Sequence, residues 1–112
     1  KHWIGYAKRP VGKLLVDAGA ARAITAEGKS LLPAGVCGVE GDFHVGDAVE
    51  VAGPGGELLA KGLVNYDSNE VRKVMGMRSD QVARMLGERC EEVVHRDSMV
   101  VFKAEPEEGR GE

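Results

Sequence analysis

Aromatic residues are scarce in this chain. They make up 4% of its 112 residues, with one Trp, two Tyr and two Phe. The core of the single domain that fits this length must therefore consist mainly of Val, Leu, Ala and Met side chains. Long apolar runs are absent, and so is the charged-then-apolar order of a signal peptide. We therefore expect a soluble, cytoplasmic protein that does not associate with membranes.

Cysteine is rare as well. Cys37 and Cys90 stand far apart, and neither belongs to a Cys-x-x-Cys motif or a Cys/His cluster. This spacing excludes a zinc ribbon and a dithiol redox motif. We expect both residues to be buried free thiols in a reducing compartment.

Catalytic motifs are also missing. His2, His44 and His95 are isolated from one another, so they do not predict a metal site or a catalytic pair. The triplet at 95–97 is similar to the His-Arg-Asp of kinases, but the Asn that follows in that motif is absent. The glycine-rich stretch 53–56 lacks the Lys-Ser/Thr of a phosphate loop and is typical of a hairpin turn. The sequence predicts no catalytic residue, metal ligand or cofactor-binding residue in this chain.

The net charge of −3 is unevenly distributed. Residues 104–112 carry one base and four acids, which is 1 − 4 = −3, and we expect this stretch to be a flexible tail. Residues 1–36 carry six bases and two acids, which is 6 − 2 = +4. Such a surface can meet phosphates, although an ordinary solvated surface also shows charge differences of this size.

Two short helices are indicated by their capping residues. The Asp17 side chain is suited to cap a helix over 18–25, and Gly28 stands where a left-handed residue would end it. Ser68 is expected to cap a second helix over 69–75. The expected helices are too short to cross over a parallel sheet, which disfavours a βαβ fold.

Short β-rich segments separate these helices, and Gly62 within one of them predicts a bulge or bend. A third helical segment has an apolar stripe at Val82, Met85 and Leu86 that we expect to face the sheet. Residues 96–98 are turn-prone. The expected strands are 12–16, 36–40, 48–52, 58–66 and 99–102. We predict a mainly β fold with short helices, an α+β composition arranged as a small, partly closed barrel of about five strands.

Features suited to nucleic acid lie near the first helix. Free backbone N–H groups at its start, residues 17–20, attract phosphate, although the Asp17 carboxylate opposes this. Gly19 and Ala20 either let a ligand backbone approach or let the helix lie flat on the barrel. Trp3 and Tyr66 either stack on bases or belong to the core. The basic residues of this region are Lys8, Arg9, Lys13, Arg22 and Lys29.

Several motifs in a fixed order make the chain resemble a PUA domain, the module named after pseudouridine synthase and archaeosine transglycosylase. They are Leu15-Val16-Asp17-Ala18-Gly19-Ala20, Ser30-Leu31-Leu32-Pro33-Ala34-Gly35-Val36, Val39-Glu40-Gly41-Asp42-Phe43 and Gly46-Asp47-Ala48-Val49. Further motifs resemble the C-terminal PUA domain of the bacterial glutamate 5-kinase family. These are Trp3-Ile4, Gly62-Leu63-Val64-Asn65-Tyr66, Met75-Gly76 followed by Ser79, and Glu92-Val93-Val94-His95-Arg96-Asp97-Ser98.

The resemblance implies a PUA-like β pseudo-barrel over residues 1–103 and a non-catalytic, regulatory or assembly role. The parent enzyme would transfer the γ-phosphate of ATP to L-glutamate with Mg²⁺, in proline biosynthesis. That chemistry would reside in an amino acid kinase domain absent from this chain, and the parent would be a homo-oligomer. The abrupt start at Lys1 fits a chain cut from a longer one.

The resemblance also implies an RNA-binding surface, since PUA domains elsewhere bind RNA through the first helix and the adjoining loop. The matching positions are Gly19, Ala20, Arg22, Lys29, Leu32 and Pro33. The alternative is a free-standing RNA-binding PUA module of an RNA-modification or translation-related protein.

Overall fold

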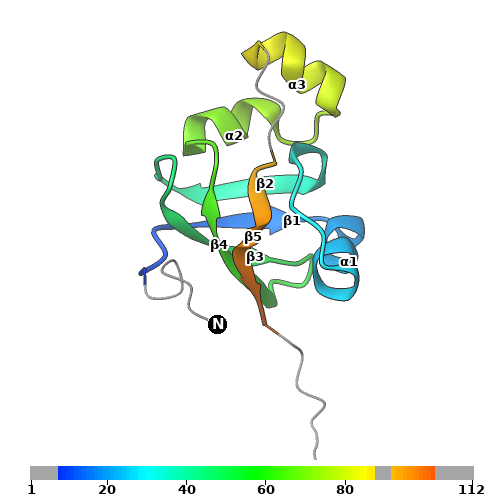
Figure 1. The fold of residues 1–112 in the computed structure, drawn as a ribbon, viewed down its shortest axis with the longest axis vertical. Coiled ribbons are helices and arrows are strands. Elements are labelled where there is room, and N and C mark those ends of the chain that lie inside the picture. The colour runs from blue at the N-terminus through cyan, green and yellow to red at the C-terminus, as the bar shows by residue number, and fades with distance from the viewer. Residues whose placement is uncertain (1–7, 88–91, 103–112) are drawn as a thin grey trace, which may run out of the picture.

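The computed structural model describes residues 8–87 and 92–102, and Figure 1 shows one sheet with helices along its edges. The expected tail at 104–112, Trp3 and Cys90 lie outside the described residues. The elements in chain order are β1 (Gly12–Val16), α1 (Ala18–Glu27), the 3-10 turn η2 (Pro33–Gly35), β2 (Val36–Gly41), β3 (Ala48–Ala52), β4 (Leu58–Val64), α2 (Ser68–Val74), α3 (Ser79–Leu86) and β5 (Val94–Val101).

The five strands form one mixed sheet in the order β2-β1-β3-β4-β5. Neighbouring strands are antiparallel except β1 and β3, which run parallel. The predicted mainly β fold with short helices is confirmed. The sheet does not close into a barrel, because β2 and β5 remain separate edges. A single bridge between Leu31 and Val94 ties the segment before η2 to β5.

The core consists mostly of aliphatic side chains, as the low aromatic content requires. The predicted inward positions Val49 and Val51 are confirmed, and both are 0% exposed. Ala48 and Ala52 point to the opposite face of β3 and are also buried, because β3 is the middle strand. Of the fully buried side chains, Tyr66 and Phe43 are the largest.

The helix caps are local features that the sequence determines in part. The Asp17 carboxylate accepts a hydrogen bond from the Ala20 N–H at 2.7 Å, and Gly28 adopts the left-handed conformation with φ of 66°. Both predictions for α1 are confirmed. The prediction that Ser68 caps α2 is wrong. Asp67 is the N-cap, and its reciprocal hydrogen bonds with Glu70 form a capping box, while Ser68 is buried inside the helix start.

Helix α3 does not face the sheet, contrary to the prediction. It packs on α2 and η2, and Figure 1 shows it at the far end of the molecule from β3 and β4. Of its apolar stripe, Val82 is buried and Leu86 packs partly buried against the hydrophobic core, whereas Met85 is 50% exposed. An amphipathic pattern indicates that a helix has an apolar face, but it does not say which neighbour covers that face.

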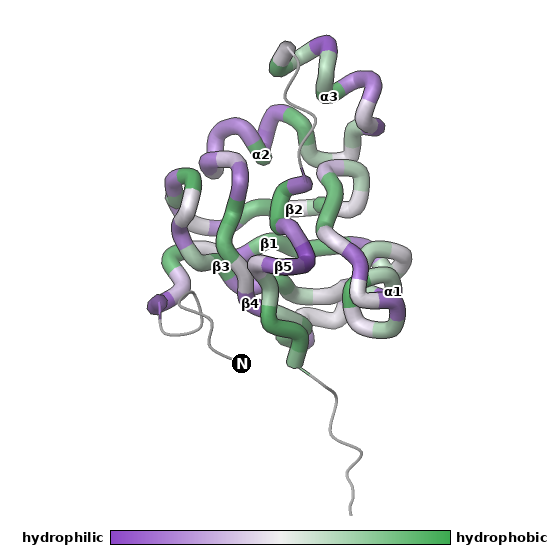
Figure 2. The backbone as a smooth tube through the Cα atoms, in the orientation of Figure 1, coloured by the Kyte–Doolittle hydropathy of each residue, from purple (hydrophilic) through white to green (hydrophobic). Residues whose placement is uncertain are grey.

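Strand β5 contains the stretch that the sequence predicts as a turn, and that prediction is wrong. Val94 pairs with Val64 and Met99 pairs with Gly62, so residues 95–98 bulge out of the ladder. Figure 2 shows this stretch as hydrophilic between hydrophobic ends. The predicted irregularity at Gly62 is confirmed, because the register shifts between Gly62 and Val64.

Cys37 is exposed, so the prediction of a buried thiol is wrong for this residue. It lies on β2, which is an edge strand paired only with β1. Successive side chains of a strand point to opposite faces, and at an edge one of these faces can remain in solvent.

Candidate nucleic-acid interface

Gly19 and Ala20, the two small residues at the start of α1, differ in their surroundings. Gly19 is exposed, and a Cβ placed there would meet only the Asp17 Oδ1 atom, at 3.6 Å. Ala20 is half-buried, and a Cβ on Gly35 would lie 2.5 Å from its own Cβ. Ala20 therefore packs α1 against η2, whereas Gly19 leaves the helix start open to a ligand.

The loop between α1 and η2 lies beside this helix start. Lys29 is exposed and forms an ion pair with Glu27, with the Nζ and Oε1 atoms 3.5 Å apart. Leu32 is 48% exposed, and Pro33 is buried, with its carbonyl oxygen accepting a hydrogen bond from the Gly76 N–H at 2.8 Å. Pro33 is therefore positioned to shape the loop and is not on the surface.

The bulge of β5 adds a basic side chain that the sequence analysis did not include. The Arg96 N–H donates to the Ser30 Oγ at 2.8 Å, and the Leu31 N–H donates to the Val94 carbonyl oxygen at 2.9 Å. Arg96 is exposed and is held beside Ser30, the residue that follows the exposed Lys29. No local signal could have shown this, because Ser30 and Arg96 are 66 residues apart in the chain.

His95 and Asp97 flank Arg96 and are joined locally. The Asp97 N–H donates to the His95 Nδ1 at 3.0 Å, and the Asp97 Oδ2 lies 3.6 Å from the same nitrogen. The His95 Nδ1 atom therefore accepts a hydrogen bond from the backbone two residues further along the chain. The pair holds the shape of the bulge, and thereby the direction of Arg96.

The charges around this surface nearly cancel. The exposed bases Arg22, Lys29 and Arg96 are matched by the exposed acids Asp17, Glu27 and Asp97. The other bases that the sequence analysis considered are elsewhere. Lys8 donates from its Nζ to the Gly46 carbonyl oxygen at 3.0 Å, near the opposite end of β1, and Lys13 lies on the sheet. Contact with a nucleic acid would thus depend on individual side chains more than on a broad positive field.

Neither aromatic residue considered for base stacking is available on the described surface. Tyr66 is 0% exposed and belongs to the core. Trp3 lies outside the described residues. Stacking by Tyr66 therefore forms no part of the interface.

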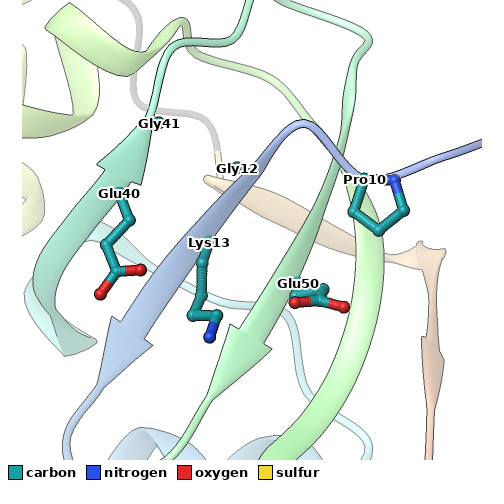
Figure 3. Close-up of a pocket in the computed structure, with 6 residues that line it drawn as sticks. All are labelled: Pro10, Gly12, Lys13, Glu40, Gly41 and Glu50. Atoms are coloured by element: carbon teal, nitrogen blue, oxygen red, sulfur yellow. The ribbon is translucent and has the colours of Figure 1, made fainter.

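A second surface feature is a row of charges across the sheet. The register places Lys13 of β1 opposite Glu40 of β2 and Glu50 of β3, and places Glu50 opposite Lys61 of β4. Figure 3 shows three of these side chains on neighbouring strands, beside Pro10, Gly12 and Gly41. Together they line a shallow, open hollow of about 330 Å³.

Within residues 8–87 and 92–102, no group of three or more His, Cys, Asp or Glu side chains is placed to hold a metal ion. In the same ranges, no helix is long and apolar enough to cross a bilayer.

Comparison with known proteins gives consistent matches. Residues 12–86 match the PUA domain family. The chain is 51% identical over 102 residues to the glutamate 5-kinase of Synechococcus elongatus, covering 90% of this chain and 28% of that protein. It is 48% identical over 103 residues to the glutamate 5-kinase of Trichlorobacter lovleyi, covering 91% of this chain and 27% of that protein. The match is to the C-terminal region of these kinases.

Among solved structures, a PUA domain from Aeropyrum pernix in a tartrate complex has a TM-score of 0.61 and 32% sequence identity. The match covers 76% of this chain and 41% of that one. An archaeal box H/ACA sRNP complex has a TM-score of 0.54 at 22% identity, covering 83% of this chain and 24% of that one, which shows a shared fold. The chain spans a little more than a quarter of the length of the curated kinases it matches.

Proposed function

Because the chain belongs to the PUA domain family, we propose that it is the accessory C-terminal domain of a glutamate 5-kinase, with a regulatory or assembly role in that enzyme. The observation that carries this proposal is the degree of identity to two kinases from different bacteria, 51% and 48% over about nine-tenths of the chain. The PUA domain of Aeropyrum pernix, at 32%, is less similar over a smaller part of the chain.

The parent enzyme would use ATP and Mg²⁺ to phosphorylate the side-chain carboxylate of L-glutamate in the cytoplasm. The described residues do not fit those cofactors. The glycine-rich stretch 53–56 is a hairpin turn, in which Gly53 and Gly56 are tied by a backbone hydrogen bond of 2.9 Å. Because neither a phosphate loop nor a carboxylate cluster is present in the described residues, we assign ATP and Mg²⁺ to the amino acid kinase domain of the same polypeptide.

Two measurements test this assignment. The reading frame upstream of Lys1 should encode an amino acid kinase domain, and an uninterrupted upstream frame without one would exclude the proposal. The purified 112-residue chain should form no ADP from ATP in the presence of glutamate and Mg²⁺. Turnover by the pure chain would show that the catalytic residues had been misassigned. A variant with a disrupted core, purified in the same way, is the control, because it should be inactive unless a contaminating kinase forms the ADP.

RNA binding is the second candidate function, and it is favoured by the exposed bases Arg22 on α1, Lys29 in the loop that follows, and Arg96, which is held beside that loop. A phosphate at the exposed helix start would compete with the Asp17 carboxylate, which accepts from the Ala20 N–H, so the basic side chains carry this candidate function by contacting the backbone of a structured RNA. Of the family positions, Leu32 offers apolar contact and Ala20 and Pro33 support the surface from below. This function is compatible with a place in the kinase.

We predict that the double substitution Arg22→Glu and Lys29→Glu weakens the binding of a structured RNA about tenfold or more at 50 mM salt. Each lost phosphate contact also lowers the slope of log K against log salt by about one unit. The measurement is a fluorescence anisotropy titration at two salt concentrations. The matched control is the double substitution Lys8→Glu and Arg9→Glu, which makes the same charge change of −4 near the opposite end of β1. Equal losses in both variants would indicate a non-specific effect of charge, and no saturable binding by the unmodified chain at micromolar concentration would reject the function.

A further inference from the structure

Two exposed valines lie at the end of the sheet where β1 begins. Val11 precedes β1 and is 48% exposed, and Val45, in the loop between β2 and β3, is 59% exposed. The Val11 N–H donates to the Ala48 carbonyl oxygen at 2.9 Å, and the Lys8 Nζ donates to the Gly46 carbonyl oxygen at 3.0 Å. Figure 1 shows both segments on the same side of the molecule. We call Val11 and Val45 the valine surface.

The turn that carries Val45 is fixed by hydrogen bonds at both of its ends. The Asp47 N–H donates to the His44 carbonyl oxygen at 2.9 Å, and the His44 N–H donates to the Asp47 Oδ2 at 2.8 Å. Gly46 has a φ of 93°, and its N–H donates to the Val64 carbonyl oxygen at 2.8 Å. Val45 is therefore presented to solvent by a rigid backbone. An exposed apolar side chain that is held in place loses little conformational entropy when a partner covers it.

The backbone that leads into β1 is restricted as well. The ring of Pro10 fixes its own φ and disfavours a helical conformation at Arg9, so the segment enters the sheet in an extended form. The Val11 carbonyl oxygen approaches β2 closely, since a Cβ on Gly41 would lie 2.8 Å from it. The polypeptide ahead of β1 is thus directed along a defined path beside the valine surface.

Basic side chains surround the two valines. Lys8 and Arg9 are exposed, and the His44 side chain is 90% exposed. The Asp47 carboxylate nearby accepts the hydrogen bond that closes the turn. An apolar centre with a polar rim is the usual arrangement of a protein interface. The matching face of a partner would be an apolar depression with acidic residues at its edge.

Most of the polypeptide of the matched kinases lies ahead of this domain. The match covers 28% of the Synechococcus elongatus protein and falls in its C-terminal region, so 100 − 28 = 72% of that protein lies outside the match. In such a protein the preceding part is joined covalently to the segment that contains Lys8 and Val11. A link of this kind gives an effective concentration on the order of mM for contacts close to the junction.

We propose that the valine surface docks against the amino acid kinase domain that precedes this chain in the same polypeptide. This proposal rests on the proposed function as the accessory domain of a glutamate 5-kinase. Two valine side chains are far less than the interface of a stable complex between separate molecules, so the docking depends on the covalent link. The docked state would fix the direction in which the rest of the PUA domain, including Arg22 and Lys29, points from the kinase.

The exposed His44 reports on the docking through its reaction with diethyl pyrocarbonate, measured by peptide mass spectrometry. The enzyme encoded by the complete reading frame is compared with the 112-residue chain. His95 on β5, with a side chain 41% exposed, is the reference within the same molecule. In the complete enzyme the His44 rate should fall about tenfold, because the tethered domain covers it for most of the time, and the His95 rate should stay unchanged.

Two substitutions identify the surface. Val45→Asp and Val11→Asp should each bring the His44 rate in the complete enzyme to within about twofold of the rate in the 112-residue chain with the same substitution. Leu58→Asp is the matched control, since Leu58 is 46% exposed and pairs with Ala52 at the opposite end of β3. It should leave His44 protected. The valine variants of the short chain should melt close to the unmodified chain because both side chains are exposed.

The possible failures are distinguishable. Equal His44 rates in the complete enzyme and in the short chain would overturn the docking and leave the kinase assignment intact. Protection that neither valine variant removes would also overturn it, since the contact would then use another surface. Protection that grows with the concentration of the short chain alone would assign the surface to a second copy. An upstream reading frame without a kinase domain would exclude the proposed function, and this docking with it.

Discussion

Replacing Phe43 with alanine should lower the free energy of unfolding by about 3 to 5 kcal/mol, the range found for truncating a buried aromatic side chain. Phe43 is 1% exposed, and its ring lies against Gly12, where an added Cβ would be 2.6 Å from the Phe43 Cδ2. The neighbouring core is aliphatic and formed by strands, so it cannot collapse into the space that the ring leaves. A loss of this size is a large fraction of the stability of a small domain.

The position of Phe43 increases the expected effect. Its carbonyl oxygen accepts a hydrogen bond from the Ser68 N–H at 3.0 Å, and its N–H donates to the Ser68 Oγ at 3.2 Å. The residue therefore fixes the start of α2 as well as filling the core. Urea unfolding followed by circular dichroism measures the change. Leu58→Ala, at a site 46% exposed, is the control and should change the stability by less than about 0.5 kcal/mol.

The substitution Gly62→Ala should destabilise the protein by about 1 to 3 kcal/mol, although it adds one methyl group only. A Cβ at this position would clash with the Val94 Cγ1 and would lie 2.9 Å from the Ser98 carbonyl oxygen. The carbonyl belongs to the backbone of the β5 bulge and cannot rotate away as a side chain would. The pairing of β4 with β5 must shift to accommodate the methyl group.

Thermal unfolding of Gly62→Ala should accordingly begin with loss of protection in the β5 amides, measurable by hydrogen exchange. Gly19→Ala is the matched control, because the same methyl group would meet only the Asp17 Oδ1 at 3.6 Å. This variant should be unchanged or slightly more stable, since alanine favours the helix. An equal loss of stability in both variants would contradict the close approach at Gly62.

The features that sequence reasoning predicted correctly are those determined within a few residues. The cap by Asp17, the left-handed Gly28 and the hairpin at 53–56 each depend on neighbours in the chain. The error at Ser68 is of the same local kind. Asp67 and Glu70 have the spacing of a capping box, which places the N-cap one residue before Ser68.

The features that were not predicted depend on contacts between distant residues. Residues 96–98 contain turn-prone residues, yet pairing with β4 holds them in a bulged strand. The exposure of Cys37 follows from the edge position of β2, which depends on the order of all five strands. The parallel pairing of β1 with β3 likewise has no signature in either strand.

The residues of the candidate interface also differ in whether the sequence alone could identify them. Arg22 and Lys29 lie on or beside α1 and were found from the charge of the N-terminal region. Arg96 was not, because a contact with Ser30 across the fold places it there. Whether a family position such as Pro33 lies on the surface or beneath it also depends on packing between elements.

The bridge between Leu31 and Val94 has a consequence for the order of events during synthesis. The ribosome releases α1 and the loop that follows it long before it releases β5, whose Val94 and Arg96 hold that loop through Leu31 and Ser30. The loop therefore lacks its anchor until the last strand has emerged. A nascent chain that stops before Val94 would present Arg22 and Lys29 without the backbone that fixes their surroundings, so competence to bind RNA would be acquired only when translation of the domain is nearly complete.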